Sequence, residues 1–505
     1  MRLRLFLPLL PCLLALQSTN AQSLQDFEKK VTKFTLPNGL TFIVIERHEA
    51  PVVSFHTYAN VGSVDDPTGR TGLAHMFEHM AFKGTPTIGT KNWPEEKKAL
   101  DAIEQVYDRL EAEQNKAFRA DPKKIEAIEA DLKGAIEKAN SFVEENEFDR
   151  IVESNGGVGM NADTAEDHTE FFYSFPSNRL ELWFLLEADR FLNPVFREFY
   201  KERDVVREER RMRTESSPVG NLVEMALSTG FSAHPYKNPA VGWSSDIESL
   251  RATEAEAFYK RYYVPSNLTI GIAGDVNPAE AKRLAEKYFA RLPKGNNPPI
   301  VHTVEPPQEG QKRVAVASPA QPFLLIGYKR PDQYSADDAP LDVLNDLLSD
   351  GRTGIIYKEM VRDKKIALGA ESLASFPGGK YPSMFLFFVA PTSGHSVDEN
   401  EKAVYDIVER VKKEKPDAES LQRVKTKLRA GLIRKLANNS GLASELATYE
   451  STFGDWRKLF TELDDYNKVT ADDVLRVANK YLVENTRTVA YTYTPEKENA
   501  KGATK

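Results

Sequence analysis

Short apolar runs alternate with longer amphipathic segments along most of the chain, and this alternation predicts a mixed α+β fold. Residues 41–45 and 51–60 are rich in β-branched and alternating apolar residues, so both are predicted to be strands. Residues 72–80 contain no proline and follow a glycine and a threonine, and they are predicted to form a helix. The chain therefore begins with two strands that lead into a helix.

The order of elements partly repeats. A helix at 253–263, with a capping box that starts at Thr253, precedes a strand at 268–273, and a helix capped by Thr470 and ending near Tyr481 precedes a strand at 488–492. In the second half a strand at 322–328 precedes a helix at 339–348, just as a strand precedes the helix at 72–80. Residues 293–311 are rich in proline, glycine and polar residues, which is typical of a linker. We predict two similar halves, 30–292 and 312–497.

Residues 92–143 differ from their surroundings. Apolar residues recur there at helical spacing in two runs, and Asp121 followed by Pro122 between the runs is typical of a helix N-terminus. We interpret this region as a highly charged helical hairpin inserted into the first half. A solvated decoration without a catalytic role, which could be deleted without unfolding the protein, is the favoured interpretation.

The first 21 residues are typical of a secretory signal peptide. Arg2 and Arg4 precede an apolar run, and small residues at 19–21 suit a signal peptidase. Cleavage would remove Cys12, the only cysteine, and would exclude disulfides and a thiolate mechanism. A retained anchor is the alternative, and no later stretch is apolar enough to span a bilayer. The net charge of -8 argues against a nucleic-acid partner.

Two histidines in the predicted helix at 72–80 carry the candidate chemistry. His75 and His79 are one turn apart and share a face, which suits two imidazoles that bind one metal ion. Glu78 lies at the edge of that face, near a metal-bound water without being a ligand. His-x-x-Glu-His is the inverted zinc-protease motif, although a surface helix with two unrelated histidines can produce the same pattern.

A second helix is predicted from Pro194 to about Arg213. Glu202 and Glu209 are two turns apart on it and share a face, whereas Glu208 is rotated away. A helix this charged is usually a solvated face, so its spacing alone is weak support for a metal ligand.

Several motifs together resemble the pitrilysin/insulinase family of zinc metallopeptidases, in particular the short bacterial branch similar to the mitochondrial processing peptidase. The resemblance covers nearly the whole mature chain. It rests on His75-x-x-Glu78-His79, Asn161-Ala162-x-Thr164, Glu202 with Glu209, Phe231-x-x-His234-Pro235-Tyr236 leading to Gly242, and Tyr263-Val264-Pro265-Ser266-Asn267 followed by Gly274-Asp275-Val276.

The resemblance implies one Zn²⁺ per chain. His75, His79 and Glu209 would be its ligands, which leaves a fourth position open for a water. Glu78 would be the general base that takes a proton from this water and passes it to the leaving amine, and Glu202 would support the site. The implied activity is a secreted or periplasmic zinc endopeptidase that hydrolyses peptides or unfolded polypeptide segments.

The implied fold is a pair of homologous α+β domains, each a mostly antiparallel sheet covered on one face by helices, which together form half of a clamshell chamber. Substrate would bind as an added strand near Asn161, Ala162 and Thr164. The family's second half also supplies an arginine, which matches Arg362, and a tyrosine seven residues later, where this chain has Gly369.

A second two-domain subunit, either a related chain or a second copy, would complete the chamber and could supply the missing tyrosine. The gap of 130 positions between His79 and Glu209 is longer than the family's, and the hairpin accounts for the excess. Two alternatives remain: a non-catalytic or partner-dependent subunit of a peptidase complex, and a metal-dependent hydrolase of another bond.

Overall fold

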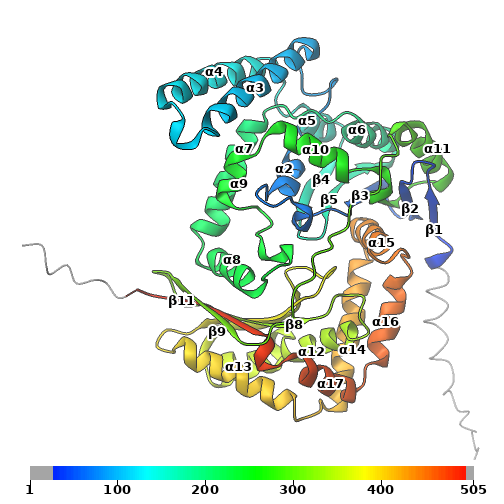
Figure 1. The fold of residues 1–505 in the computed structure, drawn as a ribbon. Helices are drawn as coiled ribbons and strands as arrows, with labels where there is room; N and C mark the ends of the chain where they lie inside the picture. The colour runs from blue at the N-terminus through cyan, green and yellow to red at the C-terminus, as the bar shows by residue number, and fades with distance from the viewer. Residues whose placement is uncertain (1–26, 496–505) are drawn as a thin grey trace, which may run out of the picture.

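The computed structural model describes residues 27–495, which form two β-sheets with helices packed against them (Figure 1). The first sheet has the order β1-β2-β6-β3-β5-β4 and the second has the order β7-β11-β8-β10-β9. The strands of the first sheet are β1 (Val31–Thr35), β2 (Thr41–Glu46), β3 (Val52–Ala59), β4 (Val158–Thr164), β5 (Thr169–Pro176) and β6 (Leu268–Gly274). The strands of the second are β7 (Lys312–Ala317), β8 (Leu324–Arg330), β9 (Ala367–Phe376), β10 (Ser383–Pro391) and β11 (Arg487–Tyr493).

The helices fall into two sets that follow the two halves of the chain. The first half contains α2 (Leu73–Met80), α3 (Trp93–Gln114), α4 (Pro122–Asn140), α5 (Glu147–Ser154), α6 (Leu180–Leu192), α7 (Phe199–Arg210), α8 (Pro218–Gly230), α9 (Ser244–Ser249), α10 (Ala252–Tyr262) and α11 (Pro278–Tyr288). The second half contains α12 (Asp338–Leu348), α13 (Val397–Val411), α14 (Ala418–Lys435), α15 (Asn439–Phe453), α16 (Lys458–Lys468) and α17 (Ala471–Tyr481).

The two sheets share one connectivity. Strands β2, β6, β3, β5 and β4 of the first sheet occupy the places of β7, β11, β8, β10 and β9 in the second. In both sheets one parallel pair, β2 with β6 or β7 with β11, adjoins a run of antiparallel pairs. The predicted fold of two similar, mostly antiparallel α+β halves is therefore confirmed.

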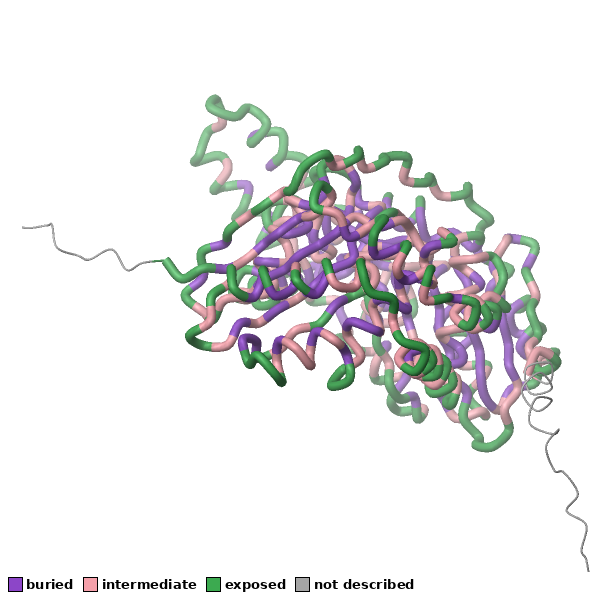
Figure 2. Tube along the Cα trace, turned by 90° about the horizontal axis from the view of Figure 1, so that it is seen from below, coloured by how far each residue is buried: buried purple, intermediate pink, exposed green. Residues whose placement is uncertain are grey.

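Strands β2, β3 and β6 of the first sheet are buried on both faces because both faces of this part of the sheet are covered. Phe42 and Val44 of β2 lie in the core with α2, α6 and α10, whereas Ile43 and Ile45 lie in a separate cluster with α15 and α16. Figure 2 shows the buried residues concentrated along the strands and the helix faces against them. Full burial of an aliphatic side chain contributes about 1.5–3 kcal/mol, so alternate residues of one strand stabilise two different layers.

Each half sends one helix to the sheet of the other half. Helix α15, from the second half, packs on β2, β3 and β6, and α8, from the first half, packs on β7 and β11. Gly271 of β6 permits this contact, because a Cβ at this position would lie 2.0 Å from the carbonyl oxygen of Ala443. The apolar clusters formed by these two helices join the halves into one body.

Two predicted helix starts are wrong. The helix that carries Glu202 and Glu209 begins at Phe199 and not at Pro194, because Glu198 has a φ of 56°, which no helix interior allows. The helix predicted to start at a capping box on Thr253 is α10, which starts at Ala252, and the carboxylate of Glu254 accepts the N–H of Arg251. The predicted caps Asp121 and Thr470 do accept backbone N–H groups at the starts of α4 and α17.

The inserted hairpin consists of α3 and α4, which pack on each other, and its base belongs to the first core. Ala99 and Ile103 in the first half of α3 are buried in that core, and Glu96 is fully buried. The interpretation of this hairpin as a solvated decoration is therefore wrong for its base, although its charged outer faces are exposed.

The predicted signal peptide and Cys12 lie outside the described residues. Within residues 27–495, none of the helices has the length and apolar character that crossing a membrane requires.

Candidate metal centre

The candidate centre is built on α2, a short helix with two distinct sides. Leu73, Met76 and Phe77 are buried in the first core and fix the helix on the sheet. The buried carboxylate of Asp66 accepts the N–H groups of Gly72 and Ala74 at 2.6 and 2.9 Å, which satisfies donors that the first turn would otherwise leave unpaired. The histidine side chains emerge from the remaining side.

Helix α7 supplies two carboxylates to the same place. Glu202 and Glu209 lie on one side of it, and their side chains are 12 and 16% exposed. Glu208 points away, since its side chain is 53% exposed and pairs with Arg211. The helical spacing of 202 and 209 thus turns both carboxylates toward α2.

His75, His79 and Glu209 converge so that one ligand atom from each lies within 4.8 Å of the others. Oε2 of Glu209 is 3.6 Å from Nε2 of His75 and 3.4 Å from Nε2 of His79. The two imidazole rings are nearly perpendicular, at 88°, with centroids 4.9 Å apart. Three donors from two helices therefore face one point.

This donor set fits zinc. With ligand distances of about 2.0–2.1 Å, two ligands of a tetrahedral zinc lie about 3.3 Å apart, close to the two histidine–glutamate distances. Two imidazoles and one carboxylate are the ligands of known catalytic zinc sites that keep a fourth position open.

The second nitrogen of each histidine is placed differently. Nδ1 of His79 lies 3.4 Å from Oε2 of Glu202, so a proton on Nδ1 can be donated to Glu202 while Nε2 keeps its lone pair for a metal. Nδ1 of His75 is buried and has no hydrogen-bond partner among the described residues. Of the two histidines, only His79 is oriented by a carboxylate.

Several charges act on the pKa values of this centre. Burial and the neighbouring His79 lower the pKa of His75 to about 4, which keeps its imidazole neutral. Burial raises the pKa of Glu78, and a hydrogen bond with Thr164 and the charge of His79 act in the opposite direction. A neutral imidazole is the form that binds a metal, and a carboxylate with a raised pKa is a better proton acceptor.

The exposed edge of the first sheet passes beside this centre. Strand β4 is the last strand of the sheet, so its outer N–H and C=O groups have no partner strand within residues 27–495. Asn161 and Ala162 of β4, together with Glu78 and His79, line a cavity of about 270 Å³. Two of the residues predicted to bind peptide therefore share one cavity with Glu78, His79 and Glu202, whereas His75, Glu209 and Thr164 do not line it.

Arg362 is not brought to this site. It lies in the short helix η9 (Tyr357–Asp363), its side chain is 57% exposed, and it pairs with the neighbouring Asp363. None of its contacts within residues 27–495 reaches the histidines. Gly369 lies on β9, where a Cβ would have no neighbour within 4 Å.

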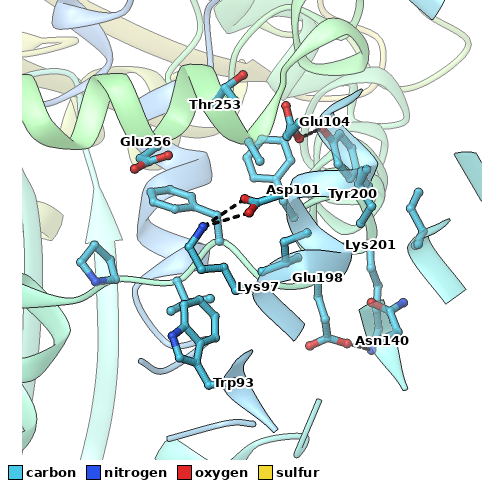
Figure 3. A pocket seen from close by; sticks show the side chains of 18 of the residues that line it. Trp93, Lys97, Asp101, Glu104, Asn140, Glu198, Tyr200, Lys201, Thr253 and Glu256 are labelled. Carbon is cyan, nitrogen blue, oxygen red and sulfur yellow. Dashed lines mark hydrogen bonds and ion pairs between the residues drawn. The ribbon is translucent and has the colours of Figure 1, made fainter. Parts of the chain in front are cut away.

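A larger hollow of about 350 Å³ separates the base of the hairpin from the body of the first half (Figure 3). Trp93 and Leu100 of α3 and Phe199 of α7 give it apolar walls, and Glu198 and Lys201 lie at its side. None of its lining residues is a histidine, whereas His79 lines the smaller cavity.

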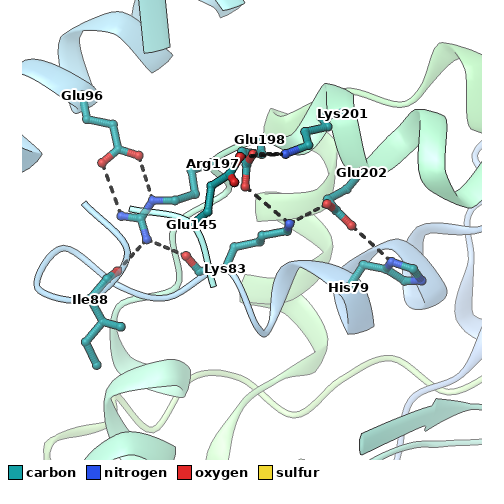
Figure 4. Close-up of polar contacts among 9 residues, drawn as sticks. All are labelled: His79, Lys83, Ile88, Glu96, Glu145, Arg197, Glu198, Lys201 and Glu202. Carbon is teal, nitrogen blue, oxygen red and sulfur yellow. Dashed lines mark hydrogen bonds and ion pairs between the residues drawn. The ribbon is translucent and has the colours of Figure 1, made fainter. Parts of the chain in front are cut away.

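Three charged residues beside the centre were not predicted from the sequence. Lys83, Arg197 and Glu198 form a network that reaches His79 through Glu202 (Figure 4). Lys83 follows His79 by four positions, which is a weak signal, because α2 ends at Met80. Partners more than 100 positions away in the chain give no local pattern.

Comparison with known protein families identifies the family to which this chain belongs. The description "Insulinase (Peptidase family M16)" matches residues 41–115 and 136–242, and the description "Peptidase M16 inactive domain" matches residues 249–428. The chain belongs to the M16 peptidase family. The unmatched residues 116–135 fall in the hairpin and comprise the turn after α3 and most of α4.

Curated relatives match almost the full chain. The zinc protease PqqE of Helicobacter pylori is 27% identical over 479 residues, which are 92% of this chain and 94% of the relative. An uncharacterized zinc protease of Bacillus subtilis, YmxG, is 20% identical over 462 residues, which are 90% of this chain and 96% of the relative. The M16 relatives are therefore named as zinc proteases.

Solved structures have the same fold. A protease from Helicobacter pylori superposes with a TM-score of 0.76 at 26% identity, over 92% of this chain and 99% of that one. The periplasmic protease PqqL from Escherichia coli gives a TM-score of 0.66 at 15% identity, which shows the fold alone, over 93% of this chain and 48% of that one. This M16 chain thus has about half the length of PqqL.

Proposed function

We propose that this M16 chain is a zinc-dependent endopeptidase that hydrolyses peptides or unfolded polypeptide segments, with one zinc held by His75, His79 and Glu209. The observation that carries the proposal is the convergence of these three side chains beside Glu78 and the open edge of β4. A bound zinc would supply a Lewis acid and lower the pKa of a water to about 7.

Glu78 acts as the proton carrier. Its position at the edge of the histidine face keeps it out of the ligand set, and it lines the same cavity as His79. Its carboxylate takes a proton from the water that attacks the peptide carbonyl, and it delivers that proton to the nitrogen of the leaving amine. General base catalysis of this kind contributes about 10²–10⁴-fold to the rate.

Glu202 orients His79. By accepting the proton of Nδ1, it keeps Nε2 directed toward Glu209, 3.4 Å away. The tautomer of a ligating histidine is commonly set by such a partner, and loss of the partner typically costs 10–100-fold in metal affinity or activity.

The substrate backbone pairs with β4. An extended peptide added to this edge through Asn161, Ala162 and Thr164 takes its affinity from main-chain hydrogen bonds, which do not depend on side-chain identity. The cavity of about 270 Å³ beside it has room for a side chain of the bound peptide. This arrangement favours peptides over small esters or phosphates.

We further propose that a second two-domain subunit faces this one and closes a chamber around the substrate. Two observations support it: this chain spans 48% of PqqL, and Arg362 lies outside the described contacts of the centre. The partner is a second copy or a related chain, and it would provide the groups that hold the substrate carbonyl. The apolar N-terminal stretch with Arg2 and Arg4 supports a periplasmic or secreted location.

The function is tested by elemental analysis of the purified mature chain, followed by incubation with an unstructured peptide library and with panels of esters and phosphate esters. We expect one zinc per chain and cleavage of peptides alone. Zinc-loaded protein that cleaves none of the peptides, with or without partner chains from the same cells, would favour a non-catalytic subunit. Cleavage of esters or phosphates alone would favour a hydrolase of another bond.

A further inference from the structure

We propose that Lys83 is a positioning residue of the candidate metal centre. Its ammonium holds the Glu202 carboxylate in the orientation in which it meets His79, and Glu198 in turn holds Lys83. The inference rests on the proposed zinc site and assigns a role to two residues that are not metal ligands and that line the cavity beside β4.

The contacts form a chain from ligand to cation. Nζ of Lys83 donates to Oε1 of Glu202 at 2.5 Å, and the other oxygen of the same carboxylate lies 3.4 Å from Nδ1 of His79. The last torsion of a glutamate side chain is soft and nearly two-fold. An ammonium fixed on one oxygen removes this freedom and leaves the other oxygen directed at the imidazole.

Glu198 is placed to hold the ammonium from the other side. One of its oxygens lies 3.4 Å from Nζ of Lys83, and the other accepts from Nζ of Lys201 at 2.7 Å (Figure 4). The backbone of Glu198 has a φ of 56°, a left-handed conformation that is unfavourable for a non-glycine residue. Such strain is retained where the surroundings use the side chain, and here the carboxylate bridges two cations.

Arg197 fixes the backbone from which Lys83 extends. Its guanidinium donates to the carbonyl oxygens of Lys83, Thr85 and Ile88 at 2.5, 2.8 and 2.7 Å. It passes so close to two glycines that a Cβ on Gly84 or Gly89 would lie 2.9 or 2.6 Å from its Nη1. Three hydrogen bonds therefore hold the loop that follows α2, and from this backbone Lys83 reaches Glu202.

Removal of the cation has a defined consequence. The side chains of Glu198 and Glu202 are 6 and 12% exposed, and both face Lys83. Without its ammonium, two nearly buried carboxylates share one space and repel each other. Glu202 then turns away from His79, and the imidazole loses the partner that orients it.

The test measures zinc release from the full mature chain to an excess of a chelator. The variants are Lys83→Met, Glu202→Gln and the double variant, and the matched control is Lys98→Met, a lysine that is 72% exposed and pairs with Glu95. We expect Lys83→Met to release zinc about 10–100-fold faster than the unaltered chain, in the range seen for lost supporting partners. The control should release it at the unaltered rate.

The double variant separates positioning from a general structural role. If Lys83 acts through Glu202, the double variant releases zinc no faster than the faster single variant, because both changes disable one path. Effects that multiply in the double variant would overturn the inference, and so would an unaltered release rate for Lys83→Met.

One further variant distinguishes failure of the inference from failure of the proposed function. Glu209→Gln removes a proposed ligand. If it loses zinc while Lys83→Met releases zinc at the unaltered rate, the zinc site stands and the role of Lys83 is wrong. If Glu209→Gln retains zinc as tightly as the unaltered chain, the proposed site itself is wrong, and the role of Lys83 falls with it.

Discussion

Replacement of Glu96 by glutamine tests how firmly the hairpin is joined to the catalytic half. Glu96 of α3 is fully buried, and its carboxylate accepts Nε of Arg197 at 2.7 Å and Nη2 at 3.4 Å. The side chain of Arg197 is 1% exposed, so Glu96→Gln leaves a buried guanidinium without its carboxylate partner. Breaking a buried ion pair costs about 3–5 kcal/mol of stability. Because the glutamine amide keeps one oxygen that can accept from Arg197, we expect the free energy of unfolding to fall by about 3 kcal/mol, the lower end of this range.

The measurement is thermal unfolding of the zinc-free protein, so that metal binding does not mask the change. At about 2.1 cal/mol/K of unfolding entropy per residue, the melting temperature falls by about 1 °C per kcal/mol if residues 27–495 unfold as one body and by about 2 °C if the first half unfolds alone, which gives an expected decrease of about 3–6 °C. Glu95→Gln, one position earlier, is the matched control, because the side chain of Glu95 is 49% exposed and pairs with Lys98. A melting temperature for Glu96→Gln within about 2 °C of the control would refute the reasoning and restore the hairpin as a detachable decoration.

Three other predictions follow from the same contacts. Glu209→Gln should strip zinc while Glu208→Gln retains it, as elemental analysis would measure, and equal loss in both would contradict the orientation of α7. Burial raises the pKa of Asp337, but hydrogen bonds from Lys480, Tyr481 and Arg476 outweigh it and lower the pKa to about 2. The ionised form therefore contributes about 2 kcal/mol above pH 4, a contribution lost as the pH falls toward 2, and Asp337→Asn should lower the urea midpoint at pH 7 by a margin that narrows below pH 4. An unchanged midpoint at pH 7 would contradict this. Finally, specific activity should fall on dilution as light scattering records dissociation of the two-subunit chamber, and a monomer with full, concentration-independent activity would exclude the chamber.

Local signals predicted the elements that local chemistry determines. The Asp121-Pro122 pair and Thr470 stand at helix starts because a side-chain oxygen satisfies N–H groups two or three residues later. Pro194 is also typical of a helix start, but no helix starts there. Glu198 takes a left-handed backbone and Arg197 turns inward, so α7 starts only at Phe199. Tertiary contacts overrode a local preference there.

In the candidate site, too, some residues could be predicted from local pattern and others depend on tertiary contacts. Helical periodicity alone placed His75 and His79 on one face, whereas only the fold could bring Glu209, 130 positions from His79, within 3.4 Å of it. Lys83 and Glu198 could not be predicted, because each gains its role from a partner more than 100 positions away. The exchange of α8 and α15 between the halves was equally hidden, since an apolar helix face does not specify which sheet covers it.

The central claim is that Glu78 transfers protons at a zinc centre that it does not help to hold. The most direct test is one preparation of Glu78→Gln, assayed for bound zinc by elemental analysis and for cleavage of an unstructured peptide that the unaltered chain cleaves. We predict one zinc per chain, as in the unaltered protein, and turnover reduced by at least about 10²–10⁴-fold. A variant that loses its zinc, or one that cleaves the peptide at the unaltered rate, would contradict the claim.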